Sequence, residues 1–201
     1  MNSFNQGFIF ASSIRHCVLK SYCIQQKMEL NEAIELIKNE NINSAKQTSW
    51  ADLGCGSGLF TQALAHLLEP RSKLFAVDKN IYALNKLKHV NNITIEKVQA
   101  DFIADKLDFI NLDGILMANS FHFVRNKIEF IVKTEQYLKA NGCFLFVEYD
   151  TDSHNPWVPY PVSYNSLVHL FKEHKYNGVE KLNQLPSRYN RSTIYSALVI
   201  R

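Results

Sequence analysis

The residues best suited to bind a ligand stand in one glycine-rich turn and in the acid that precedes it. Gly54, Gly56 and Gly58 follow a short apolar run that contains Asp52, and a helical pattern begins at Leu59. Glycine lacks a β-carbon, so the backbone can bend sharply here and approach a ligand closely. An acid two residues before the first glycine would repel a pyrophosphate but attract an ammonium or sulfonium group. The turn therefore favours a positively charged ligand.

The glycine spacing argues against two common nucleotide motifs. A dinucleotide fingerprint needs G-x-G-x-x-G, and the position of its third glycine is occupied here by Leu59. A phosphate-binding loop needs Gly-Lys-Ser or Gly-Lys-Thr, which does not follow the turn. A plain glycine-rich connection without a ligand remains the alternative.

Three further polar residues stand at the ends of the strands predicted next. Asp78 lies 24 residues after Gly54, where a carboxylate can accept hydrogen bonds from both ribose hydroxyls. Asp101 and Asn119 follow the third and fourth predicted strands. Ligands of open α/β sheets bind outside the carboxyl ends of the strands, so these residues are expected to converge with the turn. The alternatives are an Asp78 that caps a surface helix and an Asp101 that is merely solvated.

Over residues 46–150 the chain resembles the class I S-adenosylmethionine-dependent methyltransferases, whose first motif is an acid followed by G-x-G-x-G. The resemblance implies that Asp101 accepts from the adenine amine, that Phe102 lies against the adenine ring, and that Asn119 lines the methyl-donor pocket. Taken alone, Phe102 is as well explained as a core residue. The implied cofactor is S-adenosyl-L-methionine, with S-adenosyl-L-homocysteine (SAH) as product. The cofactor-binding residues that it implies are Asp52, Gly54, Cys55, Gly56, Gly58, Asp78, Lys79, Asp101, Phe102 and Asn119.

Candidates for catalysis follow from the chemistry of a sulfonium methyl group, which is already activated for transfer. The enzyme has mainly to align the reactants and exclude water, and a base is needed only for an acceptor protonated at neutral pH. The candidate catalytic residues are His122, Glu148 and Tyr149, and the candidate substrate-binding residues are Trp157, Tyr160 and Arg188. Three of these residues have a structural alternative: His122 only packs or hydrogen-bonds a loop, Glu148 pairs locally, and Arg188 is solvated.

A small-molecule acceptor is favoured by what the chain lacks. Nucleic-acid enzymes of this superfamily that methylate amino groups carry Asp/Asn-Pro-Pro-aromatic after the fourth strand, and residues 119–122 here read Asn-Ser-Phe-His. The formal net charge is only +3, so no nucleic-acid partner is expected. Two other functions remain open: an NAD(P)-dependent oxidoreductase and a cofactor-binding protein without transfer activity.

The helices and strands that must position these residues can be predicted from the alternation of apolar strand-like runs with helical segments. This order predicts an α/β, Rossmann-like doubly wound sheet of seven strands, mostly parallel, with a C-terminal antiparallel hairpin and helices on both faces. Residues 1–45 are expected to form an N-terminal helical lid segment, and residues 46–201 a single methyltransferase domain. The predicted strands are 48–52, 73–77, 93–99, 113–118, 143–149, 178–183 and 193–200, and the predicted helices are 27–40, 59–68, 81–90, 127–138 and 164–172.

Composition fits one compact unit of 201 residues, 46% of them hydrophobic and 20% charged. The four cysteines form no C-x-x-C pair, so neither a zinc site nor a disulfide framework is expected. No apolar run approaches the roughly 20 residues that span a bilayer, and the amino-terminal residues lack the pattern of a signal peptide. We therefore expect a soluble cytoplasmic protein without a bound metal.

Overall fold

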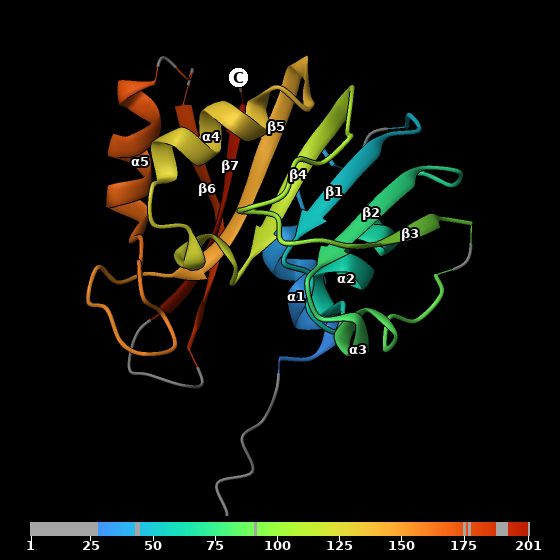
Figure 1. The fold of residues 1–201 in the computed structure, drawn as a ribbon, viewed down its shortest axis with the longest axis horizontal. Helices are drawn as coiled ribbons and strands as arrows, with labels where there is room; N and C mark the ends of the chain where they lie inside the picture. Colours follow the sequence, from blue (N-terminus) through green and yellow to red (C-terminus); the bar gives the residue numbers. More distant parts are fainter. Residues whose placement is uncertain are drawn as a thin grey trace, which may run out of the picture.

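The computed structural model describes residues 28–42, 45–90, 92–174, 176, 178–187 and 193–200. They form a seven-stranded sheet in the order β3-β2-β1-β4-β5-β7-β6, in which the first five strands along the chain are parallel and β7 is antiparallel to both of its neighbours (Figure 1). This arrangement confirms the predicted fold. The strands are β1 (Ser49–Leu53), β2 (Lys73–Asp78), β3 (Thr94–Gln99), β4 (Leu112–Ala118), β5 (Leu138–Tyr149), β6 (Gly178–Pro186) and β7 (Thr193–Ile200).

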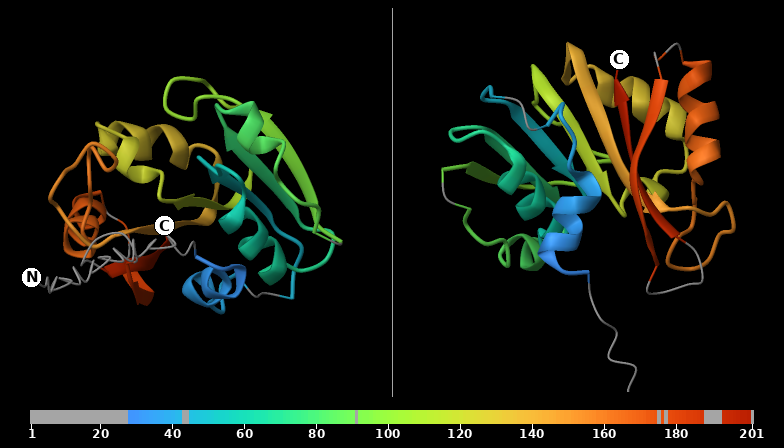
Figure 2. Two further views of the ribbon diagram at one scale, coloured as in Figure 1. Left: turned by 90° about the horizontal axis from the view of Figure 1, so that it is seen from below. Right: turned by 180° about the vertical axis from the view of Figure 1, so that it is seen from behind.

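Helices cover both faces of the sheet. Seen from behind in Figure 2, α1 and α2 lie in front of the strands, while α4 and α5 lie on the other side. Successive side chains of β4 point to opposite faces of the sheet. Ile115 and Met117 pack with α4 and α5, whereas Leu116 between them packs with α1 and α2. The helical elements are α1 (Leu30–Ile37), α2 (Leu59–Leu67), α3 (Ile81–Leu84), α4 (Lys127–Glu135), α5 (Tyr164–Glu173) and the short 3-10 helix η1 (Phe121–Phe123).

Several predicted elements have different bounds in the structure: the helix expected over 27–40 spans Leu30–Ile37, the helix expected over 127–138 ends at Glu135, and the strand expected over 178–183 runs to Pro186. Two further differences have a clear cause in the packing. The helix expected over 81–90 ends at Leu84, because the chain then tightens into i→i+3 turns that bury Leu84 and Leu87 together against Ala76. Strand β5 begins five residues before the expected Cys143, because a bulge between Leu112 and Gly114 lets Leu138 pair with Leu112 ahead of the regular pairing that starts at Cys143. Local sequence signals did not reveal either change, since both depend on packing against the sheet.

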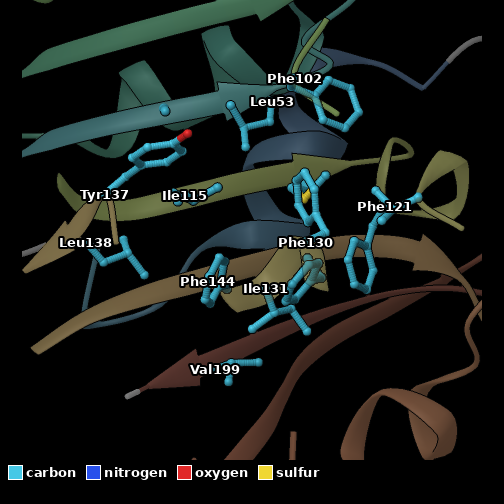
Figure 3. Close-up of a cluster of buried hydrophobic side chains, with 14 of the residues drawn as sticks. Leu53, Phe102, Ile115, Phe121, Phe130, Ile131, Tyr137, Leu138, Phe144 and Val199 are labelled. Atoms are coloured by element: carbon cyan, nitrogen blue, oxygen red, sulfur yellow. The ribbon is translucent and has the colours of Figure 1, made fainter. Parts of the chain in front are cut away.

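The segment that connects β3 to β4 along the chain is a loop that packs on one face of the sheet. A doubly wound fold often has a helix in this connection. The loop side chains Phe102, Leu107 and Phe109 are buried in the same cluster as Phe130 of α4. Figure 3 shows Phe102, from the loop after β3, and Phe121, from η1, reaching into this cluster. The rings of Phe102 and Phe130 meet edge to face with centroids 5.9 Å apart, so the core anchors the loops that follow the strands.

None of the helices within the described ranges is long and apolar enough to cross a membrane.

Candidate functional site

The glycine turn between β1 and α2 is held in a conformation that suits glycine. Gly54, Gly56 and Gly58 have φ values of 82°, 54° and 87°. A β-carbon on Gly58 would lie 1.9 Å from Leu87 Cδ2, and one on Gly54 would lie 2.6 Å from Ser120 Cβ. A β-carbon on Gly56 would meet no atom within 4 Å. The two outer glycines therefore permit close packing, while the middle one faces open space.

Asp52 is fully buried beneath this turn. Thr61 Oγ1 donates a hydrogen bond of 2.6 Å to Oδ2, whereas Oδ1 is buried without a partner among the described residues. Burial, opposed by the hydrogen bond from Thr61 and assisted by the charge of Asp78, raises the pKa of Asp52 from 3.8 to about 7. A cationic group close to Asp52 would favour the ionised form. The carboxyl group thus suits an ammonium partner better than an anionic one.

Asp78 ties the turn to the end of β2. Its Oδ2 accepts from the backbone N–H of Gly56 at 2.8 Å, and its Oδ1 accepts from that of Asn80 at 2.8 Å. A carboxylate has about four acceptor positions, so each oxygen can accept a second bond from a ligand. Cys55 lies half-buried in the same turn, where burial raises the pKa of its thiol.

A smaller cavity of about 350 Å³ opens beside Asp78 at the carboxyl ends of β1 to β4. Asp101 caps the following turn, since its Oδ1 accepts from the backbone N–H groups of Ile103 and Ala104. The structure brings five of the predicted cofactor residues together with Asn119 here, and adds four that the sequence did not single out. The lining residues are Gly54, Asp78, Lys79, Ala100, Asp101, Phe102, Ile103, Asn119, Ser120 and Phe123.

The turn after β4 is fixed from both sides. The N–H of Asn119 donates to the carbonyl of Val147 in β5 at 2.8 Å, and Ser120 Oγ donates to the carbonyl of Leu53 in β1 at 2.6 Å. Asn119 adopts a left-handed conformation with φ 53°, which asparagine tolerates better than most residues. Its Oδ1 is buried and has no partner among the described residues. This orphaned acceptor is available to a ligand.

His122 and Glu148 form a buried pair behind this turn. Glu148 Oε2 lies 2.7 Å from His122 Nδ1, and Oε1 accepts from the backbone N–H groups of Phe121 and His122. Side-chain exposures are 4% for His122 and 1% for Glu148. A carboxylate oxygen is an acceptor, so this contact calls for the histidine tautomer that carries a hydrogen on Nδ1. Neither residue lines the smaller cavity or the larger one described next.

A larger cavity of about 780 Å³ lies on the other side of Asn119, between α1, the start of α2 and the β6–β7 hairpin. Of the three candidate catalytic residues, Tyr149 lines it. Most of its other lining residues were not singled out from the sequence, because they come from four separate elements. The lining residues are Met28, Glu32, Ser57, Leu59, Phe60, Gln62, Asn119, Tyr149, Leu185, Pro186, Ser187 and Ile194.

Two of the predicted substrate residues, Trp157 and Tyr160, line neither cavity. Trp157 is 84% exposed on the loop after β5, and Tyr160 on the same loop lines a separate open hollow with His154 and Pro159. Arg188 lies outside the described residues.

This arrangement defines a class of protein, a parallel α/β sheet with a ligand site at the carboxyl ends of its strands. Residues 51–144 match the family model described as a methyltransferase domain. This match covers a little under half of the chain, and together with the fold it bears out the predicted resemblance to the class I S-adenosylmethionine-dependent methyltransferases and supports the enzyme class and cofactor that the resemblance implies. No curated protein matches the chain.

Solved structures with similar folds include three methyltransferases. One, from Leishmania major, is S-adenosylmethionine-dependent and has a TM-score of 0.62 and 16% identity; the match covers 78% of this chain and 65% of that one, slightly under two thirds. The plantazolicin methyltransferase BpumL in complex with SAH has a TM-score of 0.61 and 14% identity, covering 84% and 82%. The Burkholderia thailandensis 1,6-didemethyltoxoflavin-N1-methyltransferase, with its substrate and SAH bound, has a TM-score of 0.62 and 14% identity, covering 86% and 77%.

Proposed function

We propose that this protein transfers a methyl group directly from S-adenosylmethionine to a small-molecule acceptor. The observation that carries the proposal is that the two cavities share Asn119, so that space for a nucleoside adjoins space for a second molecule. The small-molecule class is supported by the low net charge of +3 and by two of the similar folds, the plantazolicin and didemethyltoxoflavin methyltransferases. The family match favours transfer over the oxidoreductase alternative.

The residues around the smaller cavity fit the proposed donor. Asp78 retains acceptor capacity for ribose hydroxyls, and Asp101 and Phe102 stand beside it for the adenine. Asn119 lines this cavity, and its unpartnered Oδ1 suits the ammonium group of the methionine part. Asp52 lines neither cavity, so its carboxyl would act on that group as a charge from beneath the glycine turn. When bound, the donor supplies an activated methyl group on a sulfonium. The chain itself then has to hold the reactants in line and exclude water.

The three candidate catalytic residues are given different roles. Tyr149 lines the larger cavity, so we assign it contact with the acceptor. His122 and Glu148 are buried away from both cavities, and we assign them a positioning role, because their three contacts hold the η1 turn that follows Asn119. Trp157, Tyr160 and Arg188 remain candidates for substrate contact at the rim.

We also propose that the N-terminal segment covers the site as a lid on the methyltransferase domain of residues 46–201. The described part of the segment supports this: Met28 and Glu32 line the larger cavity, while Ala33 and Leu36 of α1 pack into the core shared with α2. A cytoplasmic location is proposed from the scattered cysteines.

Calorimetric titration with S-adenosylmethionine and SAH tests the donor site. We expect saturable binding, and we expect Asp78→Asn to weaken it by on the order of 1.5 to 3 kcal/mol, one charge-assisted hydrogen bond. Asp108→Asn is the matched control, since Asp108 is exposed and lines neither cavity. No saturable binding by the folded protein would refute the proposal. A screen of acceptors with labelled donor then separates a transferase from a protein that only binds the cofactor.

A further inference from the structure

The character of the larger cavity says which molecules it can accept. We propose that it binds an uncharged, largely apolar acceptor, a ring compound or a lipophilic alcohol or amine, rather than a carboxylate or phosphate ester. The inference rests on the proposed function, which places the acceptor beyond Asn119.

The described lining of the larger cavity carries no positive charge. Among the described residues that line the larger cavity there is no lysine, arginine or histidine, and the charged side chain is that of Glu32. An anionic acceptor would lose its hydration in this space without gaining a cationic partner, and would also be repelled by Glu32. Burial of an unpaired charge costs several kcal/mol, which few other contacts of a small ligand can offset.

The walls of the larger cavity are largely apolar. Met28, Leu59, Phe60, Leu185 and Ile194 present apolar surface to the cavity from α2, from both strands of the hairpin and from the residues before α1. The same side chains are buried in, or packed against, the core cluster on this face of the sheet. The apolar wall is thus continuous with the core and preformed, as is usual for sites that bind apolar small molecules.

The polar side chains of Glu32, Ser57, Gln62 and Ser187 also line the cavity, and two further polar residues stand at the edge of the sheet. Asn119 and Tyr149 come from the ends of β4 and β5, at the sheet edge that the two cavities share. An acceptor bound with its polar atom toward this edge would bring its nucleophile to the donor side, and would leave its apolar body between α1 and the hairpin. The volume of about 780 Å³ accommodates a molecule of one or two fused rings.

The competing occupant is an anionic molecule held by Arg188, which follows the cavity residue Ser187 in the chain. Two fluorescent probes with the same rings distinguish the two cases. N-phenyl-1-naphthylamine is neutral, and 8-anilinonaphthalene-1-sulfonate adds one sulfonate. Both are titrated into the full chain with SAH present, and SAH binding is measured by calorimetry on the same samples.

We expect the neutral probe to bind about tenfold or more tightly than the sulfonate. Leu185→Asp and Met28→Asp should each weaken the neutral probe by about tenfold, because each places a carboxylate in the cavity wall. Met28 precedes the first turn of α1, so its variant keeps the test valid if Leu185→Asp does not fold. The control is Ile110→Asp, since Ile110 is 77% exposed and lines neither cavity, and its binding should match the wild type.

Equal or tighter binding of the sulfonate, lost in Arg188→Ala, would overturn the inference in favour of an anionic acceptor. Neutral-probe binding that neither cavity variant changes would overturn it as well. Absence of SAH binding would instead refute the proposed function itself, whatever the probes show. Retained SAH binding with equal affinity for the two probes would refute the acceptor class alone.

Discussion

Replacing Asp52 with asparagine should make the free protein more stable at neutral to alkaline pH and weaken its binding of the donor. Asp52 is fully buried, and one of its oxygens has no partner among the described residues. Asparagine has the same shape, and its oxygen can still accept the hydrogen bond of Thr61. The variant therefore removes a buried charge with little change in packing.

The size of the expected gain in unfolding free energy follows from the pKa of Asp52, which is raised, mainly by burial, from 3.8 to about 7. One pKa unit corresponds to about 1.4 kcal/mol, so keeping this carboxylate ionised in the folded protein costs on the order of 4 kcal/mol. The folded state holds the proton more tightly than the unfolded chain does. The free energy of unfolding therefore falls as the pH rises from the unfolded pKa of 3.8 through the folded pKa of about 7. About 3 kcal/mol of that fall lies between about pH 5 and about pH 8.

Urea unfolding at about pH 5 and about pH 8 measures this effect. The difference in unfolding free energy between Asp52→Asn and the wild type should be about 3 kcal/mol larger at the higher pH. Asp108→Asn, an exposed carboxyl, should show no such dependence. Calorimetry with SAH should show affinity reduced by roughly tenfold or more, since the ammonium group loses a charged partner. A stability difference that is the same at both pH values would refute the assignment of a buried, high-pKa carboxyl.

Three further variants test the frame of the site. Gly58→Ala should destabilise the fold by about 2 kcal/mol in urea unfolding, because its β-carbon would lie 1.9 Å from Leu87 Cδ2. Gly56→Ala should destabilise the fold less, since its β-carbon would meet no atom within 4 Å. Equal losses of unfolding free energy in the two variants would contradict this reasoning. Glu148→Gln should cost about 1 to 3 kcal/mol in the same assay and weaken SAH binding, since an amide NH2 would face an N–H donor; unchanged affinity would argue against a positioning role. Trp157→Ala should leave stability within about 0.5 kcal/mol, and a larger loss would show that the indole packs.

The sequence by itself determined the class of fold and most of the residues around the smaller cavity. Strand periodicity and glycine spacing are local signals, and the carboxyl ends of parallel strands must meet at one edge. The order of the strands along the chain therefore predicts that Asp78, Asp101 and Asn119 lie together, and the structure finds all three around one cavity.

Only the tertiary structure decided the larger cavity and the raised pKa of Asp52. The larger cavity draws residues from α1, α2, β4, β5 and the hairpin, and no spacing along the chain marks Met28, Gln62 or Leu185 as neighbours. Glu148 ends a strand, as the sequence indicated, but only the packing of η1 decided that it faces His122 rather than a cavity. The high pKa of Asp52 likewise depends on full burial, which is a property of the assembled core. Local patterns specify elements and their ends, whereas volumes and desolvation arise only where distant elements meet.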